Sequence, residues 1–180
     1  MGRLGPGPGG GRGRGGVAAG SAGWFVSPSR GRRTLEGMYR DLVEYMAEDP
    51  EARYKLIVGS DSQLRQELVF VTAVVCHRLG KGARYYYQRV RHRRMASLRQ
   101  RIFYETSLSL EVAGDLSRLF AERGPADVEL EIHLDIGPEG ETRDLIREIV
   151  GMVMGSGFPA KIKPEAYAAS SVADRYTKNV

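Results

Sequence analysis

One ten-residue segment constrains the fold more than any other part of the chain. Residues 68–77 are rich in β-branched and other apolar side chains, and both faces of the strand that they predict are apolar. Such a strand is typical of the centre of a sheet. A tyrosine-containing segment over residues 84–91 follows after Gly80-Lys81-Gly82, so the two segments predict a β-hairpin. A shorter apolar run over residues 55–58 precedes the hairpin and can complete a meander.

The rest of the chain alternates between helical and strand periodicity. Thr34 is the predicted N-cap of a first helix, which Asp49-Pro50 ends. The elements predicted after the meander are a helix over 97–123, a strand over 128–136, a helix over 142–154, a brief strand over 160–163 and a last helix over 170–178. The order is therefore β-β-β-α-β-α-β-α with an extra N-terminal helix, and the predicted fold class is mixed α/β.

The formal charge of +5 is unevenly distributed along the chain. Residues 1–33 contain six arginines and no acidic residue, whereas residues 34–180 contain 21 basic and 22 acidic residues. Within that second part, residues 81–101 hold eight basic residues and no acid. This asymmetry predicts a polyanionic partner, and no membrane.

Glycine dominates the first 33 residues, of which twelve are glycine. Such a segment buries too little apolar surface to offset the entropy of ordering it, so we expect a disordered tail over residues 1–33 and one folded domain over residues 34–180. Two interpretations of the tail stay open. It holds RNA loosely, as arginine-glycine segments do, or it is spacer sequence or sequence upstream of the true start.

Composition excludes several classes of protein. No stretch approaches the roughly 18 consecutive apolar residues of a membrane-spanning helix. The single cysteine, Cys76, excludes an internal disulfide framework and a multi-cysteine zinc site. We therefore expect a reducing compartment, the cytoplasm.

Four acidic residues have positions that need an explanation. Asp61 follows the first predicted strand, Asp135 lies near the end of the fourth, and Asp174 lies near the start of the last helix. Each also has a structural explanation. Asp61 can shape a turn and Asp135 a strand exit, and Asp174 can belong to a helix-capping pattern.

Glu105 is the most informative of the four acids. At about 100° per residue from Ile102, Glu105 falls at about 300°, within the apolar arc that contains Val112 and Leu116. Glu111 falls on the opposite, solvated face. A glutamate that faces a core is costly unless it is paired, for instance with Arg101, or holds a metal ion. We expect Glu105, and not Glu111, to point toward the acids at the strand ends.

Three stretches of the sequence resemble the YkuK family of ribonuclease H-like proteins. They are Val58-Gly-Ser-Asp-Ser-Gln63; His133-Leu-Asp-Ile-Gly-Pro138 with Thr142-Arg-Asp-Leu145; and Lys161-Ile-Lys-Pro164 with Ala168-Ala-Ser-Ser-Val-Ala-Asp-Arg-Tyr-Thr-Lys178. The resemblance covers about residues 34–180 and implies a ribonuclease H-like mixed sheet. It also implies carboxylates around a divalent metal, Mg²⁺ or Mn²⁺, at the positions of Asp61, Glu105, Asp135 and Asp174. His133 has two possible roles, which are to approach this site or to line its floor.

The resemblance leads to three hypotheses about function. The first is a metal-dependent nuclease that hydrolyses phosphodiester bonds in RNA or an RNA-containing duplex, with the four acids as catalytic metal ligands. The second is a non-catalytic nucleic-acid-binding or regulatory module with the same fold, and the third is a protein-interaction scaffold in which the acids are structural. In the first two, the predicted contacts to nucleic acid are Arg89, Arg91, Arg93, Arg94, Lys161 and Lys163, with stacking on Tyr85, Tyr86 and Tyr87. A solvated sheet edge with ordinary arginines is the structural alternative for this basic segment.

Overall fold

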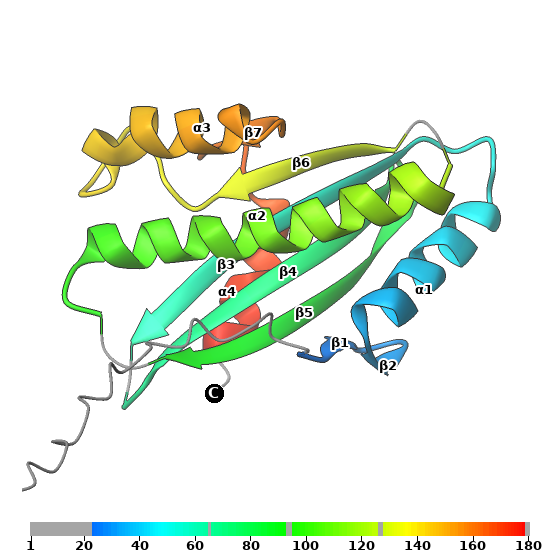
Figure 1. Cartoon of the computed structure of the whole chain (residues 1–180), viewed down its shortest axis with the longest axis horizontal. Coiled ribbons are helices and arrows are strands. Elements are labelled where there is room, and N and C mark those ends of the chain that lie inside the picture. The colour runs from blue at the N-terminus through cyan, green and yellow to red at the C-terminus, as the bar shows by residue number, and fades with distance from the viewer. Residues whose placement is uncertain (1–22, 65, 93–94, 126–127, 179–180) are drawn as a thin grey trace, which may run out of the picture.

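The computed structural model describes residues 23–64, 66–92, 95–125 and 128–178. Within these ranges the chain forms a seven-stranded sheet with the strand order β2-β1-β5-β4-β3-β6-β7 (Figure 1). The strands are β1 (Phe25–Ser27), β2 (Gly31–Arg33), β3 (Tyr54–Leu64), β4 (Leu68–Arg78), β5 (Gly82–His92), β6 (Glu129–Leu134) and β7 (Ala160–Lys161). The predicted meander is confirmed, because β3, β4 and β5 pair antiparallel in sequence order. Both β6 and β7 are parallel additions at the β3 side.

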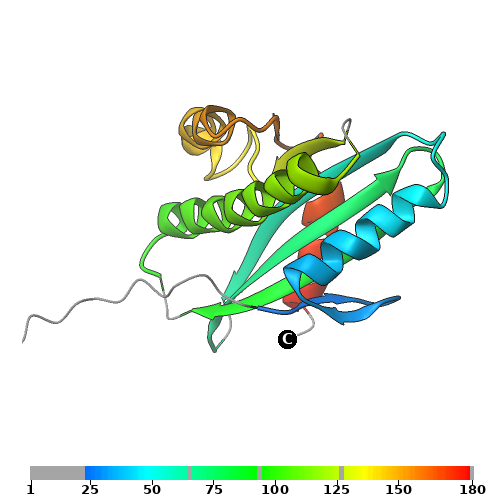
Figure 2. The ribbon, with the colours of Figure 1, turned by 45° about the vertical axis from the view of Figure 1, so that its right-hand side comes forward.

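Helices cover both faces of this sheet. They are α1 (Leu35–Ala47), α2 (Leu98–Arg123), α3 (Ile146–Gly155) and α4 (Ala168–Lys178), with a short 3-10 helix over Arg143–Leu145 ahead of α3. In Figures 1 and 2, α1 and α2 lie on one face and α4 lies alone on the other. The mixed α/β class and the ribonuclease H-like order of elements are therefore confirmed. No helix of the described ranges is long and apolar enough to cross a membrane.

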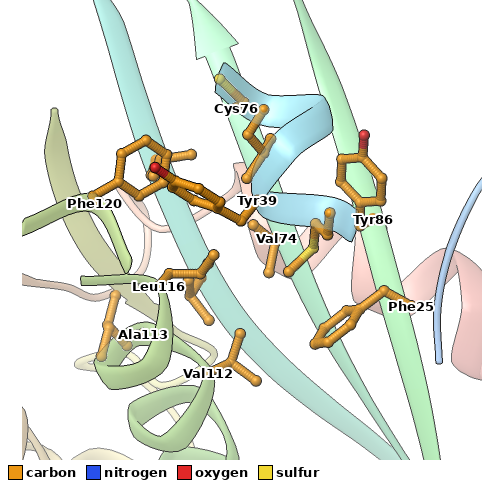
Figure 3. Close-up of a cluster of buried hydrophobic side chains, with 14 of the residues drawn as sticks. Phe25, Tyr39, Val74, Cys76, Tyr86, Val112, Ala113, Leu116 and Phe120 are labelled. Atoms are coloured by element: carbon orange, nitrogen blue, oxygen red, sulfur yellow. The ribbon is translucent and has the colours of Figure 1, made fainter. Parts of the chain in front are cut away.

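Strand alternation divides the core into two parts. Even-numbered residues of β3, such as Leu56 and Val58, join the larger core under α1 and α2, to which Figure 3 is a close-up. Odd-numbered residues such as Ile57 join a smaller core with Ala169 and Ala173 of α4. The approach of α4 is close, since a Cβ added at Gly59 of β3 would lie 2.8 Å from the Ala169 Cβ.

Two element boundaries differ from the sequence-based expectation. Strand β3 does not end at Val58, because its pairing with β4 continues without a break to Leu64↔Leu68. Asp61 therefore lies inside a strand and not in a turn. Helix α4 begins at Ala168, two residues earlier than predicted, so Asp174 lies in its second turn and not in a capping position.

The prediction that residues 1–33 form a disordered tail is wrong for residues 25–33, while residues 1–22 lie outside the described ranges. Strands β1 and β2 form a hairpin, and β1 extends the sheet next to β5. Phe25 is 3% exposed and belongs to the larger core (Figure 3). Sequence periodicity has no means of detecting strands of three residues, whose order depends on tertiary contacts.

One buried carboxylate connects this hairpin to the domain. Asp41 of α1 accepts hydrogen bonds from Arg30 Nη2 at 3.0 Å and Arg33 Nε at 2.7 Å, and from the Tyr86 hydroxyl of β5 at 3.2 Å. Burial alone would raise the pKa of Asp41, but the hydrogen bonds from the two arginines lower it below its usual value. Arg30 and Arg33 are thus partners of an acid and not part of a free basic tail.

The packing of Phe25 predicts that the hairpin contributes to stability. Phe25→Ala should lower the free energy of unfolding by about 3 kcal/mol, because it leaves a cavity in the larger core. Trp24→Ala is the matched control, since Trp24 is 50% exposed, and it should cost less than about 1 kcal/mol. Urea denaturation of the two variants measures both values. Equal small losses would show that the hairpin does not pack on the domain.

Candidate functional site

The candidate site begins where β3 and β6 run side by side. The two strands pair parallel in the register Gly59↔His133 and Ser60↔Leu134. Asp61 is the next residue of β3, and Asp135 is the first residue after β6. By strand alternation, Asp61 lies on the α4 face of the sheet, and the charges of both acids act on Glu105. Neighbouring parallel strands therefore bring two of the four predicted acids together at one end of the sheet.

Glu105 approaches this place from α2, on the opposite face. Ser62, next to Asp61 but on the α2 side of β3, donates a hydrogen bond of 2.5 Å from Oγ to Glu105 Oε1. Arg101, one helical turn before Glu105, donates from Nε to the same Ser62 Oγ at 3.2 Å. Ser62 thus holds the Glu105 carboxyl group at the end of β3, where α2 crosses it.

The Glu105 carboxyl group is strongly perturbed. Glu105 as a whole residue is half-buried, and its pKa is raised to about 8, with desolvation of the carboxyl group as the largest cause. The negative charges of Asp61 and Asp135 contribute to this rise, and the Ser62 hydrogen bond and the charge of Arg101 oppose it. At neutral pH the free site therefore favours a protonated Glu105. The predicted helix phase is confirmed, since Glu111 is exposed.

The four acids do not form a ready-made ligand set. Among the residues that the structure describes, no three His, Cys, Asp or Glu side chains are grouped closely enough to hold a metal ion. Asp174 is half-buried on α4. That helix packs on the sheet through Ala169 and Ala173, so Asp174 lies to the side of this contact.

One of the four acids forms an ion pair with a lysine. Lys163 Nζ forms an ion pair with Asp135 Oδ1 at 2.7 Å. Lys163 follows β7, which pairs parallel with β6 in the register His133↔Lys161. The sequence predicts a contact between Lys163 and nucleic acid, whereas the structure gives Lys163 an internal partner at the candidate site. Both residues follow the paired ends of adjacent strands, and the Lys163 amide donates to the carbonyl oxygen of Ile136, the residue after Asp135.

Within the described residues, the other basic side chains that were predicted to contact nucleic acid also have partners in the protein. Arg89 donates through Nε and Nη2 to the Tyr176 carbonyl oxygen near the end of α4, at 3.3 and 3.1 Å. Arg91 forms an exposed ion pair with Glu67 at 3.5 Å, and Lys161 with Glu165 at 3.3 Å. Arg93 and Arg94 lie outside the described residues. Arg89 therefore stabilises α4, whereas Arg91 and Lys161 stay on the surface in weak pairs that phosphate can replace.

The expected stacking surface on the tyrosine run is not present. Tyr87 stacks on Tyr176 of α4 with ring centroids 3.7 Å apart, and the Tyr85 and Tyr176 hydroxyl groups are 3.0 Å apart. Tyr86 points to the other face and is fully buried against Asp41. An exposed aromatic ring lies elsewhere, at Tyr167 just before α4, with 70% of its surface accessible. No sequence signal distinguishes Tyr167, because its exposure depends on how α4 docks.

His133 belongs to the floor beneath the site. It is buried on β6, and its Nε2 lies 2.8 Å from Glu131 Oε1. Lys55 of β3 approaches the same glutamate at 3.3 Å. The pKa of Glu131 is lowered, since the His133 hydrogen bond and Lys55 outweigh the effect of burial. This pairing favours the structural role of the two that the sequence left open for His133.

Comparison with known proteins agrees with this architecture. The family model described as ribonuclease H-like matches residues 37–178. The chain is 38% identical over 167 residues to a Bacillus subtilis (strain 168) protein named "Uncharacterized protein YkuK", and the match covers 86% of this chain and 96% of that protein. No solved structure gives a significant match.

The raised pKa of Glu105 predicts a pH dependence of stability. The folded protein keeps this proton up to about pH 8, whereas an ordinary glutamate loses it near 4.5. The stabilising effect of the proton is therefore complete below pH 4.5 and is lost as the pH rises to about 8, by an amount on the order of a few kcal/mol. Glu105→Gln should remove this loss, as measured by urea denaturation at several pH values.

The control for this measurement is Glu111→Gln, on the exposed face of the same helix. This variant should keep the wild-type pH dependence. Parallel curves for Glu105→Gln and the wild type would show that Glu105 is an ordinary, hydrated carboxylate.

Proposed function

The chain belongs to the ribonuclease H-like family, and on this premise we propose that it is a divalent-metal-dependent nuclease acting on RNA or an RNA-containing duplex. One observation carries the proposal. A desolvated Glu105 carboxyl group, with a pKa raised to about 8, feels the charges of Asp61 and Asp135 at the end of two parallel strands. Such clusters of perturbed carboxyl groups are typical of functional sites.

The donors suit Mg²⁺ or Mn²⁺ in chemistry. Carboxylate oxygens are the hard ligands that both ions prefer, and a cation would offset the repulsion that raises the pKa of Glu105. Binding requires two adjustments, because Glu105 must lose its proton and Asp135 must exchange its contact with Lys163. The site therefore fits a metal that binds with local rearrangement, together with the substrate.

Each side chain has a defined part in the proposed reaction. Asp61 and Asp135 would hold the metal from the rigid sheet, and Glu105 and Asp174 would complete the set from α2 and α4. A divalent metal held there would supply activation of a water and stabilisation of the leaving oxygen of a phosphodiester. Ser62 and Arg101 keep the Glu105 carboxyl group in place.

The nucleic-acid strand needs phosphate and base contacts near these acids. We propose that Lys161 and Lys163 contact phosphate, and that the exposed ring of Tyr167 stacks on a base. Lys161 ends β7, and Lys163 and Tyr167 belong to the segment between β7 and α4, which adjoins Asp135 through Lys163. Arg91 can add a phosphate contact from β5.

A non-catalytic nucleic-acid-binding module is the second candidate function. The specific observation in its favour is that the described acids are not grouped as a metal site and that Lys163 neutralises Asp135. In that case Lys161, Lys163 and Tyr167 would still bind a strand, and the acids would tune the local charge. The two candidates differ in whether metal-dependent cleavage occurs.

For the compartment, we propose the cytoplasm. Cys76 is buried in β4, and burial raises the pKa of its thiol to about 12. A lone, inert thiol is compatible with a reducing environment and gives no sign of disulfide chemistry.

Cleavage assays test the nuclease directly. With Mg²⁺ or Mn²⁺, the protein should cut RNA or an RNA/DNA hybrid, and Asp61→Asn or Asp135→Asn should reduce the rate by at least about a hundredfold, since asparagine keeps the shape but removes the charge. Asp174→Asn should reduce the rate less. Asp115→Asn, on the exposed face of α2, is the matched control and should cleave like the wild type. Metal-independent cleavage, or full activity of Asp61→Asn, would contradict the mechanism.

Thermal melting tests metal binding without a substrate. Added Mg²⁺ should raise the wild-type melting temperature, because it binds the folded chain in preference to the unfolded one. Asp61→Asn should blunt this rise. A clear metal-dependent shift without cleavage of RNA, DNA or hybrid would favour the binding module.

A further inference from the structure

The backbone fixes Lys163 beside Asp135. The Lys163 amide donates to the Ile136 carbonyl oxygen at 2.9 Å, just beyond the β6–β7 pairing. Gly137 packs against this residue so closely that an added Cβ would lie 3.1 Å from the Lys163 Cβ. Main-chain contacts thus hold the Lys163 backbone beside the segment that carries Asp135.

The ion pair lies at the surface, where a ligand can exchange with it. The side chains of Lys163 and Asp135 are 55% and 29% exposed, and their charged atoms are 2.7 Å apart. A partly exposed pair of this kind is weak, typically under about 1 kcal/mol. Lysine has a flexible stem and a point charge, so its ammonium group can leave one oxygen anion for another nearby.

The lysine also balances the charge of the site. Lys163 neutralises Asp135. A divalent cation that approached Asp135 would meet the ammonium charge at the same carboxylate, and like charges a few ångströms apart repel even in high dielectric.

We propose that Lys163 is an internal counter-ion of the acid site, which holds Asp135 in the free protein and transfers to a phosphate of the bound strand when a divalent cation takes that carboxylate. The inference rests on the proposed function and deepens it. Cation binding and strand binding then favour each other. A bound phosphate draws Lys163 away from Asp135, and a bound cation at Asp135 releases Lys163 for phosphate. The site then assembles fully only on nucleic acid.

Lys163→Met tests the inference, because methionine keeps the stem and removes the charge. Lys81→Met is the matched control, since Lys81 also forms an exposed ion pair with an aspartate, Asp49, at 2.6 Å. Free Mn²⁺ is measured by electron paramagnetic resonance during titration of the full-length chain, with and without an RNA/DNA hybrid. Without hybrid, Lys163→Met should bind Mn²⁺ at least about fivefold more tightly than the wild type. Lys81→Met should remain within about twofold.

The hybrid provides the second arm of the test. It should tighten Mn²⁺ binding to the wild type and to Lys81→Met, but not to Lys163→Met, because that variant has already lost the competitor. Unchanged Mn²⁺ affinity in Lys163→Met would overturn the counter-ion role. An equal increase in Mn²⁺ affinity in both lysine variants without hybrid would also overturn it, since the increase would then follow from the lower net charge.

Cleavage of the same hybrid separates this inference from the nuclease proposal. Tighter Mn²⁺ binding by Lys163→Met without cleavage by any chain would support the counter-ion and overturn the nuclease. Cleavage by the wild type with unchanged Mn²⁺ affinity in the variant would do the reverse. If neither chain bound Mn²⁺, both proposals would be overturned.

Discussion

The parallel ladder between β3 and β6 runs from Lys55↔Glu129 to Ser60↔Leu134, and the whole candidate site depends on this register. It brings Asp61 and Asp135 together where β6 ends, and the ladder between β6 and β7 adds Lys163 to the same end. A slip of one residue in β3 would exchange its two faces, which would turn Asp61 toward α2 and Ser62 away from Glu105. The close contact of Gly59 with Ala169 on α4 also holds this register in place.

Electrostatics explains why the acids are separate in the free protein. The carboxyl groups of Asp61, Glu105 and Asp135 would repel one another if all three were ionised in a poorly hydrated site. The structure avoids this cost in two ways, because Glu105 has a raised pKa and Asp135 pairs with Lys163. A bound cation would replace both compensations at once. The same arrangement thus accounts for a stable free domain and for carboxylates that are available to a metal.

Local patterns were sufficient to predict the meander, the Thr34 cap, whose hydroxyl accepts from the Gly37 amide at 3.0 Å, and the inward phase of Glu105. Each depends on residues that are near in sequence. The β1–β2 hairpin could not be predicted, because Asp41 and distant core residues order it. The internal partners of the basic segment could not be predicted for the same reason. Arg89 and Tyr87 contact Tyr176, which lies far along the chain, and charge counting does not identify such partners.

In the proposed site, Asp61, Glu105 and Asp135 together hold a divalent cation once Lys163 has left Asp135. The anomalous scattering of manganese tests this arrangement, in a crystal structure of the full chain with Mn²⁺ and an RNA/DNA hybrid. We expect a manganese peak within about 2.2 Å of oxygens from these carboxylates, and an ion pair between the Lys163 ammonium group and a phosphate of the hybrid. A bound hybrid with no manganese at these acids, and with Lys163 still on Asp135, would contradict it.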